Sequence, residues 1–199
     1  LHALRGPYRS LTRIADDPRV TLVHDEARSF LTRHGQPFDV LQMSLIDTWA
    51  ATGAGAFTLS ENGLSTREGW RVFLNALTPT GVFSVSRWFD PSTASETTRL
   101  VSLGVAALID AGIAAPRQHL LLVTRERVAT LIVSRTAFTS DDETRVRRVA
   151  ADLELGLLVT PWAESPDWRL ERISSAASLS QLDAAAADDD FDFRPPSDS

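Results

Sequence analysis

The most constraining feature of the sequence is an alternation of strand-like and helix-like segments through its first half. Short apolar runs occupy residues 20–23 (VTLV), 38–44 (FDVLQMS) and 82–88 (VFSVSRW), and amphipathic segments occupy residues 25–33 and 66–77 between them. Apolar runs and helical periodicity at this spacing are typical of parallel strands joined by crossover helices. The predicted fold class is therefore α/β, with helices flanking a sheet.

Local signals set the ends of these segments. Pro18 ends a helix that we expect over residues 2–16, because proline disfavours α geometry in the residue before it. Residues 35–37 (GQP) end the second helix, and Thr66 can cap the third. Residues 78–81 (TPTG) are expected to form a turn before the third strand.

The second half of the chain predicts an antiparallel arrangement. A helix over residues 95–111 is followed by two apolar runs, residues 119–123 and 128–134, whose short polar connection suits a hairpin. A capping-box pattern at residues 140–143 (SDDE) then predicts a helix over residues 140–153.

The last part of the chain changes in composition. Residues 156–160 predict a final strand, but beyond Glu164 the chain becomes polar and rich in alanine and aspartate. A segment of this composition buries little apolar surface, so fraying or disorder is expected. We therefore predict an α/β domain over residues 1–164 and a polar, flexible tail over residues 165–199.

Composition excludes several kinds of function. The net charge of -6 argues against nucleic acid as a partner, because phosphate binding requires clustered lysine and arginine. The absence of cysteine excludes disulfides and thiolate sites, and the four histidines share no metal-ligand spacing, so no metal site is expected. No apolar run approaches the length of about 20 residues that a membrane-spanning helix needs, so this segment is expected to make no membrane contact.

Polar side chains gather where the second strand-like run ends. Ser44, Asp47 and Trp49 follow its apolar residues, and Glu61 and Asn62 end the loop beyond. In open α/β sheets ligands bind at the carboxyl ends of the strands, so these side chains form a candidate site. An ordinary transition from strand to loop would give the same pattern.

Three blocks of sequence resemble a known family in their order and spacing. Residues 17–31 (DPRVTLVHDEARSFL), 38–49 (FDVLQMSLIDTW) and 61–88 (ENGLSTREGWRVFLNALTPTGVFSVSRW) are similar to the C-terminal part of spermidine synthases, most of all to larger bacterial spermidine synthase-like proteins. Residues 191–199 also resemble a segment near the end of that domain. The resemblance implies a partial Rossmann-like sheet, of the class I methyltransferase-like kind, that lacks its N-terminal strands. The chain would then be a fragment of a polyamine aminopropyltransferase-like protein.

The resemblance implies a nucleoside cosubstrate, S-adenosylmethionine or its decarboxylated form, for the whole protein. In the family, an acidic residue after the strand that corresponds to residues 20–23 binds the adenine amino group, which places Glu26 there with Ala27 beside it. A carboxylate can accept a hydrogen bond from an exocyclic amine, and backbone N–H groups at a helix start can contact a ring nitrogen. The alternative is that Asp25 and Glu26 only favour the positive end of the following helix.

The resemblance also predicts that this chain binds neither form of the cosubstrate by itself. The glycine-rich loop and the second acidic residue that hold the cosubstrate's tail and ribose in such folds should precede residue 1. No GxGxG pattern occurs in the chain, so no cosubstrate is expected to be bound by this fragment.

The acceptor side differs from the family pattern at its first catalytic position. Spermidine synthases have an Asp-x-x-Asp pair after the strand that corresponds to residues 38–43, and the first Asp helps to remove a proton from the attacking amine. Here that register reads Ser44-Leu45-Ile46-Asp47, so Ser44 replaces the first carboxylate. A serine hydroxyl without an adjacent base cannot deprotonate an ammonium near neutral pH, whereas Asp47 can still bind a cationic amine.

Other residues near this position bear on the same acceptor. The family has an aromatic residue at the position of Ser65, whose loss weakens the wall for an aliphatic amine, and Trp49 offers an aromatic face instead. Packing of Trp49 under its own loop is an equal alternative. Glu61 and Asn62 remain as polar candidates for substrate binding.

Three functions remain open from the sequence, because fold does not choose among them. The first is a transferase of the aminopropyltransferase kind, with a small-molecule amine as partner. The second is a non-catalytic binding or scaffolding domain, which the loss of the first Asp favours. The third is a small-molecule methyltransferase, which needs no such Asp if its substrate is already nucleophilic. The expected location is cytoplasmic, as a free protein or as the soluble domain of a membrane-anchored parent, and oligomerisation stays open.

Overall fold

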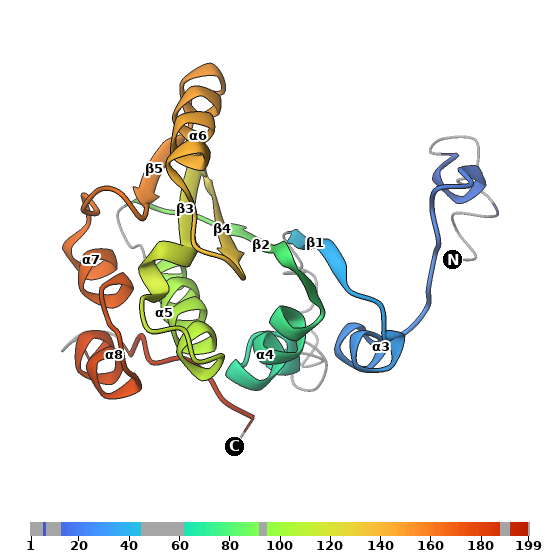
Figure 1. The fold of residues 1–199 in the computed structure, drawn as a ribbon, viewed down its shortest axis with the longest axis horizontal. Helices are drawn as coiled ribbons and strands as arrows, with labels where there is room; N and C mark the ends of the chain where they lie inside the picture. The colour runs from blue at the N-terminus through green and yellow to red at the C-terminus, as the bar shows by residue number, and fades with distance from the viewer. Residues whose placement is uncertain (1–5, 7–12, 45–61, 92–94, 188–191, 199) are drawn as a thin grey trace.

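Helices flank a single central sheet in the described part of the chain (Figure 1). The computed structural model describes residues 6, 13–44, 62–91, 95–187 and 192–198. In chain order the elements are η1 (Ile14–Asp16), α3 (Ala27–His34), β1 (Phe38–Ser44), η2 (Asn62–Leu64), α4 (Arg67–Asn75), β2 (Leu77–Trp88), α5 (Ser95–Asp110), η3 (Pro116–His119), β3 (Leu120–Arg125), β4 (Val128–Ser134), α6 (Ser140–Asp152), β5 (Gly156–Val159), α7 (Trp168–Ser174) and α8 (Leu179–Ala186). The α/β fold class predicted from the sequence is confirmed.

The sheet joins one parallel pair of strands to three antiparallel strands. Its order is β1-β2-β4-β3-β5; β1 runs parallel to β2, and all the other neighbours are antiparallel. The connection between the parallel strands contains α4, as the alternation of segments predicted. β3 and β4 form the predicted hairpin, and β5 pairs with the outer side of β3.

β2 begins earlier than the sequence predicted. Residues 78–81, which were expected to form a turn, belong to the strand. The register with β1 shifts between Phe38 and Val40, so the extra residues of β2 are accommodated as an irregularity in the pairing. Gly81 permits this arrangement, because a Cβ at that position would lie 2.8 Å from the carbonyl oxygen of Phe38.

Residues 20–23 do not form the short buried strand that their sequence predicted. They have no strand partner in the described chain, and Val23 is 51% exposed. Figure 1 shows the segment before α3 leading away from the body of the fold. A strand is stabilised by pairing with a neighbour, so an apolar run without one stays irregular. Of the helix expected over residues 2–16, Ile14–Asp16 is described as a 3₁₀ helix, and most of the remainder lies outside the described residues.

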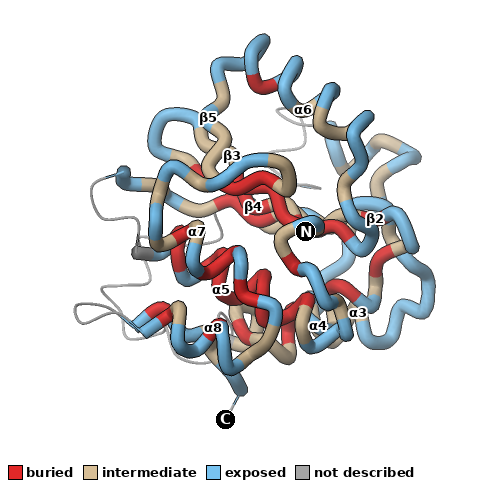
Figure 2. The backbone as a smooth tube through the Cα atoms, turned by 60° about the vertical axis from the view of Figure 1, so that its left-hand side comes forward, coloured by how far each residue is buried: buried red, intermediate tan, exposed pale blue. Residues whose placement is uncertain are grey.

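α4 and α5 pack against one face of the sheet and form the core with it. Trp70 and Phe73 of α4 approach Phe83 of β2 with ring centroids 4.9 and 5.2 Å apart. Every residue of α5 from 101 to 108 is buried. Figure 2 shows the buried residues concentrated on α5 and on the strands that it covers. The expected helix over residues 95–111 is thus the central helix of the core.

α7 and α8 extend the core beyond Glu164. Their apolar residues Leu170, Ile173, Leu182 and Ala186 are each at most 1% exposed. Both helices begin with a side chain that accepts hydrogen bonds from backbone N–H groups. Composition had predicted a flexible tail here because apolar residues are sparse. Their spacing of three or four residues nevertheless places them on one face of each helix, where the core covers them.

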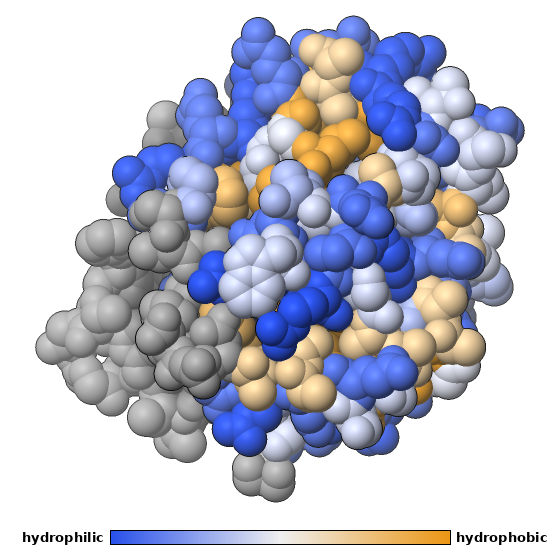
Figure 3. All heavy atoms as spheres, turned by 90° about the vertical axis from the view of Figure 1, so that its left-hand side faces the viewer, coloured by the Kyte–Doolittle hydropathy of each residue, from blue (hydrophilic) through white to orange (hydrophobic). Residues whose placement is uncertain are grey.

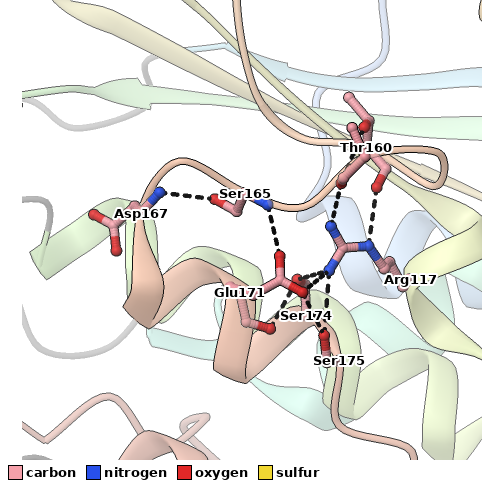
Figure 4. Close-up of polar contacts among 8 residues, drawn as sticks. Arg117, Thr160, Ser165, Asp167, Glu171, Ser174 and Ser175 are labelled. Atoms are coloured by element: carbon pink, nitrogen blue, oxygen red, sulfur yellow. Dashed lines mark hydrogen bonds and ion pairs between the residues drawn. The ribbon is translucent and has the colours of Figure 1, made fainter.

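The hydrogen bonds of Arg117 in η3 connect α7 to the end of β5 (Figure 4). Its Nε donates to the carbonyl of Thr160 at 3.0 Å, its Nη1 to Glu171 Oε1 at 2.7 Å, and its Nη2 to the carbonyl of Ala163. Burial is the largest single influence on Glu171 and raises its pKa. The backbone N–H of Ser165, the Arg117 guanidinium and the Ser175 hydroxyl together outweigh burial, so the pKa lies below its usual value. Each guanidinium nitrogen donates to a protein acceptor, so Arg117 has a structural role: it holds α7 against the segment that follows β5.

α6 has a capping box one residue before the predicted one. Thr139 Oγ1 accepts from the backbone N–H of Asp142 at 3.2 Å, and the Asp142 carboxylate accepts from the backbone N–H of Thr139 at 2.9 Å. Residues 140–143 had been assigned this role. Because the first helical residue is Ser140, the N-cap position falls on Thr139 and the N3 position on Asp142.

The surface formed by α6, α7 and α8 is mostly hydrophilic (Figure 3). Apolar side chains gather near its upper end, over α6 and β5, between hydrophilic ridges. Val149 of α6 is 42% exposed, and Leu153, the C-cap residue that follows the helix, is 48% exposed. Leu153 at the end of α6 thus differs sharply in exposure from the leucines of α7 and α8.

Candidate functional site

The carboxyl ends of the parallel strands β1 and β2 lie at the same edge of the sheet. Ser44, the last residue of β1, is exposed and aligned with Ser86 of β2. Ser86 is in turn aligned with Thr130 of β4, and the two hydroxyl oxygens are 2.9 Å apart. Aligned residues of neighbouring strands project to the same face. We call Ser44, Ser86 and Thr130 the hydroxyl row.

The hydroxyl row lies on the face of the sheet opposite to α4 and α5. Phe83 and Val85 belong to the core, and side chains alternate along a strand, so Ser86 and Trp88 project to the other face. Ser86 is 8% exposed, whereas Trp88 at the end of β2 is 46% exposed. Hydroxyl oxygens can accept hydrogen bonds from an ammonium group, and an exposed indole face attracts a cation. This edge therefore offers groups that suit a cationic ligand.

Ser86, Trp88 and Thr130 were not predicted as site residues from the sequence. Residues 84–88 read Ser-Val-Ser-Arg-Trp, so hydroxyl and indole side chains recur at every second position of the strand. That alternation was the available signal for Ser86 and Trp88. Thr130 joins the row only through the register between β2 and β4, which the sequence does not specify.

Ser65 connects the start of α4 to β2. Arg87 donates to Ser65 Oγ through Nη2 at 3.4 Å and to the carbonyl of Ser86 through Nη1 at 3.3 Å. The family resemblance implied an aromatic residue at the position of Ser65, and its hydroxyl instead accepts a hydrogen bond from β2. The chain that leads into α4 is therefore tied to the carboxyl end of β2.

Thr66 caps α4, as predicted, and a glycine lets η2 lie close to the start of this helix. Thr66 Oγ1 accepts from the backbone N–H of Gly69 at 3.1 Å. A Cβ on Gly69 would lie 2.5 Å from the carbonyl oxygen of Gly63, a distance that no side chain tolerates without a shift. The helix ends at Asn75, before the predicted end at Leu77, because Leu77 already pairs with β1.

The structure places two of the predicted acceptor-side residues. Ser44 ends β1, and Asn62 is the first residue of η2. Asp47, Trp49 and Glu61 lie outside the described residues. The hydrogen bond between Arg87 and Ser65 connects β2 to the segment between η2 and α4.

Glu26, the predicted adenine ligand, caps α3. Its two carboxylate oxygens accept from the backbone N–H groups of Arg28 at 2.8 Å and Ser29 at 2.7 Å, which is the geometry of the capping alternative. Burial is the largest single influence and favours a higher pKa for Glu26, but the hydrogen bonds from Arg28 and Ser29 together with the charge of Arg28 outweigh it, so the pKa lies below its usual value. Ala27 follows as the exposed first residue of α3. The Ser29 hydroxyl also donates to the Glu26 carboxylate, which leaves about one lone-pair site for a further donor.

The described residues contain neither a metal-binding cluster nor a membrane-spanning helix. Among them, no three His, Cys, Asp or Glu side chains come together as a metal site would require. No helix in the same residues has the length and apolar character needed to cross a membrane.

Comparison with known proteins identifies the fold. No protein-family model matches the sequence, and no curated protein does. The structure is similar to that of a probable spermidine synthase from Corynebacterium glutamicum, with a TM-score of 0.54 and 16% identity over 85% of this chain and 59% of that one. The chain has a spermidine synthase-like fold. It spans 59% of the length of that structure.

Two other spermidine synthase structures match with lower TM-scores. The enzyme from Thermotoga maritima gives a TM-score of 0.46, with 18% identity over 92% of this chain and 56% of that one. A spermidine synthase in complex with the transition state analogue AdoDATO gives 0.45, with 18% identity over 74% of this chain and 47% of that one.

Proposed function

We propose that the chain is the acceptor-side part of a spermidine synthase-like transferase with an S-adenosylmethionine-type cosubstrate. The observation that supports this most is the parallel pair β1 and β2, in the fold of a probable spermidine synthase, with Ser44, Ser86 and Trp88 at its carboxyl edge. Ligands bind at the carboxyl ends of strands in open α/β sheets. The chain then forms a soluble domain, either of a cytoplasmic protein or of a membrane-anchored one.

In the proposed site the predicted residues have distinct roles. Asp47 binds the cationic acceptor amine, Trp49 presents an aromatic face to it, and Glu61 and Asn62 supply further polar contacts. In the transfer step the amine nitrogen attacks the carbon bonded to the sulfonium sulfur, a C–N bond forms, the C–S bond breaks and a neutral thioether leaves. The attacking nitrogen must also lose a proton, which passes to solvent water, because Ser44 has no adjacent base with which to take it.

Cosubstrate binding is assigned to the start of α3. Glu26 accepts from the adenine amino group with its free lone pair, and the backbone at Ala27 contacts the ring. Capping and ligand binding are compatible, because a carboxylate has about four lone-pair sites, and the backbone N–H groups of Arg28 and Ser29 and the Ser29 hydroxyl use three of them.

A second candidate function is a non-catalytic domain that binds its ligand at the same edge of the sheet. The observation that favours it is Ser44, which stands where the family resemblance places the first catalytic carboxylate. The third, a small-molecule methyltransferase, needs only an acceptor that is already nucleophilic. Kinetic assays distinguish the three, since they differ in whether an amine is turned over.

Asp47→Asn is expected to raise the KM for the amine about ten-fold or more, because a hydrogen bond between charged groups contributes about 1.5–3 kcal/mol. The test is steady-state kinetics of a protein that includes this chain, with putrescine varied at saturating decarboxylated S-adenosylmethionine. Asp39→Asn is the matched control, because Asp39 is an exposed aspartate of β1 that hydrogen-bonds Thr78 near the other end of the strand. Equal KM values for both variants and the unmodified protein contradict the role of Asp47.

The 199-residue chain by itself is expected not to bind S-adenosylmethionine or its decarboxylated form, because it contains no GxGxG loop. Isothermal titration calorimetry of the purified chain provides the measurement, with an intact S-adenosylmethionine-binding methyltransferase as positive control. A micromolar Kd would place the whole cosubstrate site within these residues and contradict the proposed division of the site.

A further inference from the structure

The C-terminal residues 192–198 run across the start of α4, and we call them the C-terminal strap. Phe193 anchors the strap in the core, with 3% of its surface exposed. The backbone N–H of Arg67, at the first position of α4, donates to the carbonyl of Pro196 at 3.0 Å. This N–H has no partner within the helix, so the strap satisfies a group that the helix start leaves open.

Arg28 of α3 joins the strap to η2. Its Nη2 forms an ion pair with Asp198 Oδ2 at 2.6 Å, and its Nη1 donates to the carbonyl of Gly63 at 3.3 Å. The backbone N–H of Asp198 donates to Glu68 Oε2 at 3.0 Å, so the strap also contacts the first turn of α4 directly. The hydrogen bond to Asp198 raises the pKa of Arg28, and the same hydrogen bond lowers the pKa of Asp198. One guanidinium therefore contacts both the strap and η2.

We propose that Arg28 is a positioning residue for the acceptor side of the site, and that Asp198 of the strap holds it in place. η2 begins with Asn62, so fixing the Gly63 carbonyl fixes the backbone that presents this predicted substrate ligand. The planar guanidinium donates in two fixed directions at once, which an ammonium group does not do. The relevance of Asn62 rests on the proposed function; the mechanical coupling does not.

The need for Asp198 follows from the entropy of the arginine side chain. Holding a long side chain in one conformation costs more rotamer entropy than a hydrogen bond as long as that to Gly63 returns. The ion pair is partly shielded from solvent, because 29% of the Arg28 side chain and 37% of the Asp198 side chain are exposed. It is therefore stronger than a fully exposed pair. Removing Asp198 should therefore release Arg28 from η2 as well.

Hydrogen exchange of backbone amides tests the coupling without any enzymatic activity. The variants are Arg28→Gln, Arg28→Lys and Asp198→Asn, with Arg194→Gln as matched control. Arg194 forms an ion pair with Asp192 inside the strap, and both side chains are more than half exposed. We expect exchange of residues 62–69 to rise about ten-fold in Arg28→Gln and Asp198→Asn, less in Arg28→Lys, and not in the control.

Two results would overturn the proposal. One is unchanged exchange of residues 62–69 in both Arg28→Gln and Asp198→Asn. The other is an equal rise over residues 120–134, because the β3–β4 hairpin lies in the core and reports global stability. In a protein that transfers an amine, Arg28→Gln should also raise the KM for the amine with kcat retained. Absence of any turnover would count against the proposed function, while the exchange result would still decide the coupling.

Discussion

Leu170→Ala is expected to lower the free energy of unfolding by about 2–5 kcal/mol, the range for a large-to-small substitution in a packed core. Leu170 of α7 is 1% exposed and belongs to the same cluster as Leu108 of α5 and Leu182 of α8. Removing its side chain loses buried apolar surface and leaves a cavity between helices that have little freedom to collapse. The measurement is equilibrium unfolding in urea, followed by circular dichroism.

Leu153→Ala is the matched control for this prediction. It makes the same chemical change at Leu153, the C-cap residue of α6, which is 48% exposed, and should cost less than about 1 kcal/mol. A small and equal effect of the two substitutions would contradict the packing of α7. It would instead support the flexible tail that composition predicted for residues 165–199.

The helices after Glu164 show why composition misled the prediction. Residues 165–199 are polar on average, and the average conceals a few apolar residues at helical spacing, such as Leu170 and Ile173. The caps at Asp167 and Ser178 were also readable from the sequence. What the sequence did not show was the surface that covers those few residues, since α5, which packs against α7 and α8, lies far from them along the chain.

Strand prediction succeeded where a partner strand is present and failed where it is not. Residues 38–44 were predicted with their observed bounds, and they pair with β2 along their length. Residues 20–23 are at least as β-like in sequence. They have no partner among the described strands, and they do not form a strand themselves. Local propensity therefore identified candidates, and pairing decided which of them became strands.

The candidate site was predictable in part for a similar reason. Ser44 stands out because it follows an apolar strand at the end where ligands bind. Ser86 and Thr130 are ordinary strand residues in sequence, and they become neighbours of each other only through the register of the sheet. The role of Arg28 depends on contacts with Gly63 and Asp198, which are distant along the chain, so no local pattern could indicate it.

The position of Ser44 indicates what a carboxylate would do there. Ser44 is exposed at the end of β1, so an aspartate in its place would keep its hydration and its ordinary ionised form near neutral pH. Its nearest aligned neighbour, Ser86, is uncharged and already hydrogen-bonded to Thr130.

Ser44→Asp is therefore expected to create or raise amine-transfer activity about 10²–10⁴-fold, the usual contribution of a positioned general base. The measurement is steady-state turnover of putrescine and decarboxylated S-adenosylmethionine by a protein that includes this chain. Ser44→Asn is the matched control, since it has nearly the shape of aspartate but cannot take a proton from an ammonium group. If the unmodified protein and both variants are folded by circular dichroism and none turns over the amine, the aminopropyltransferase proposal fails. The binding domain and the methyltransferase then remain, because neither requires a base at position 44.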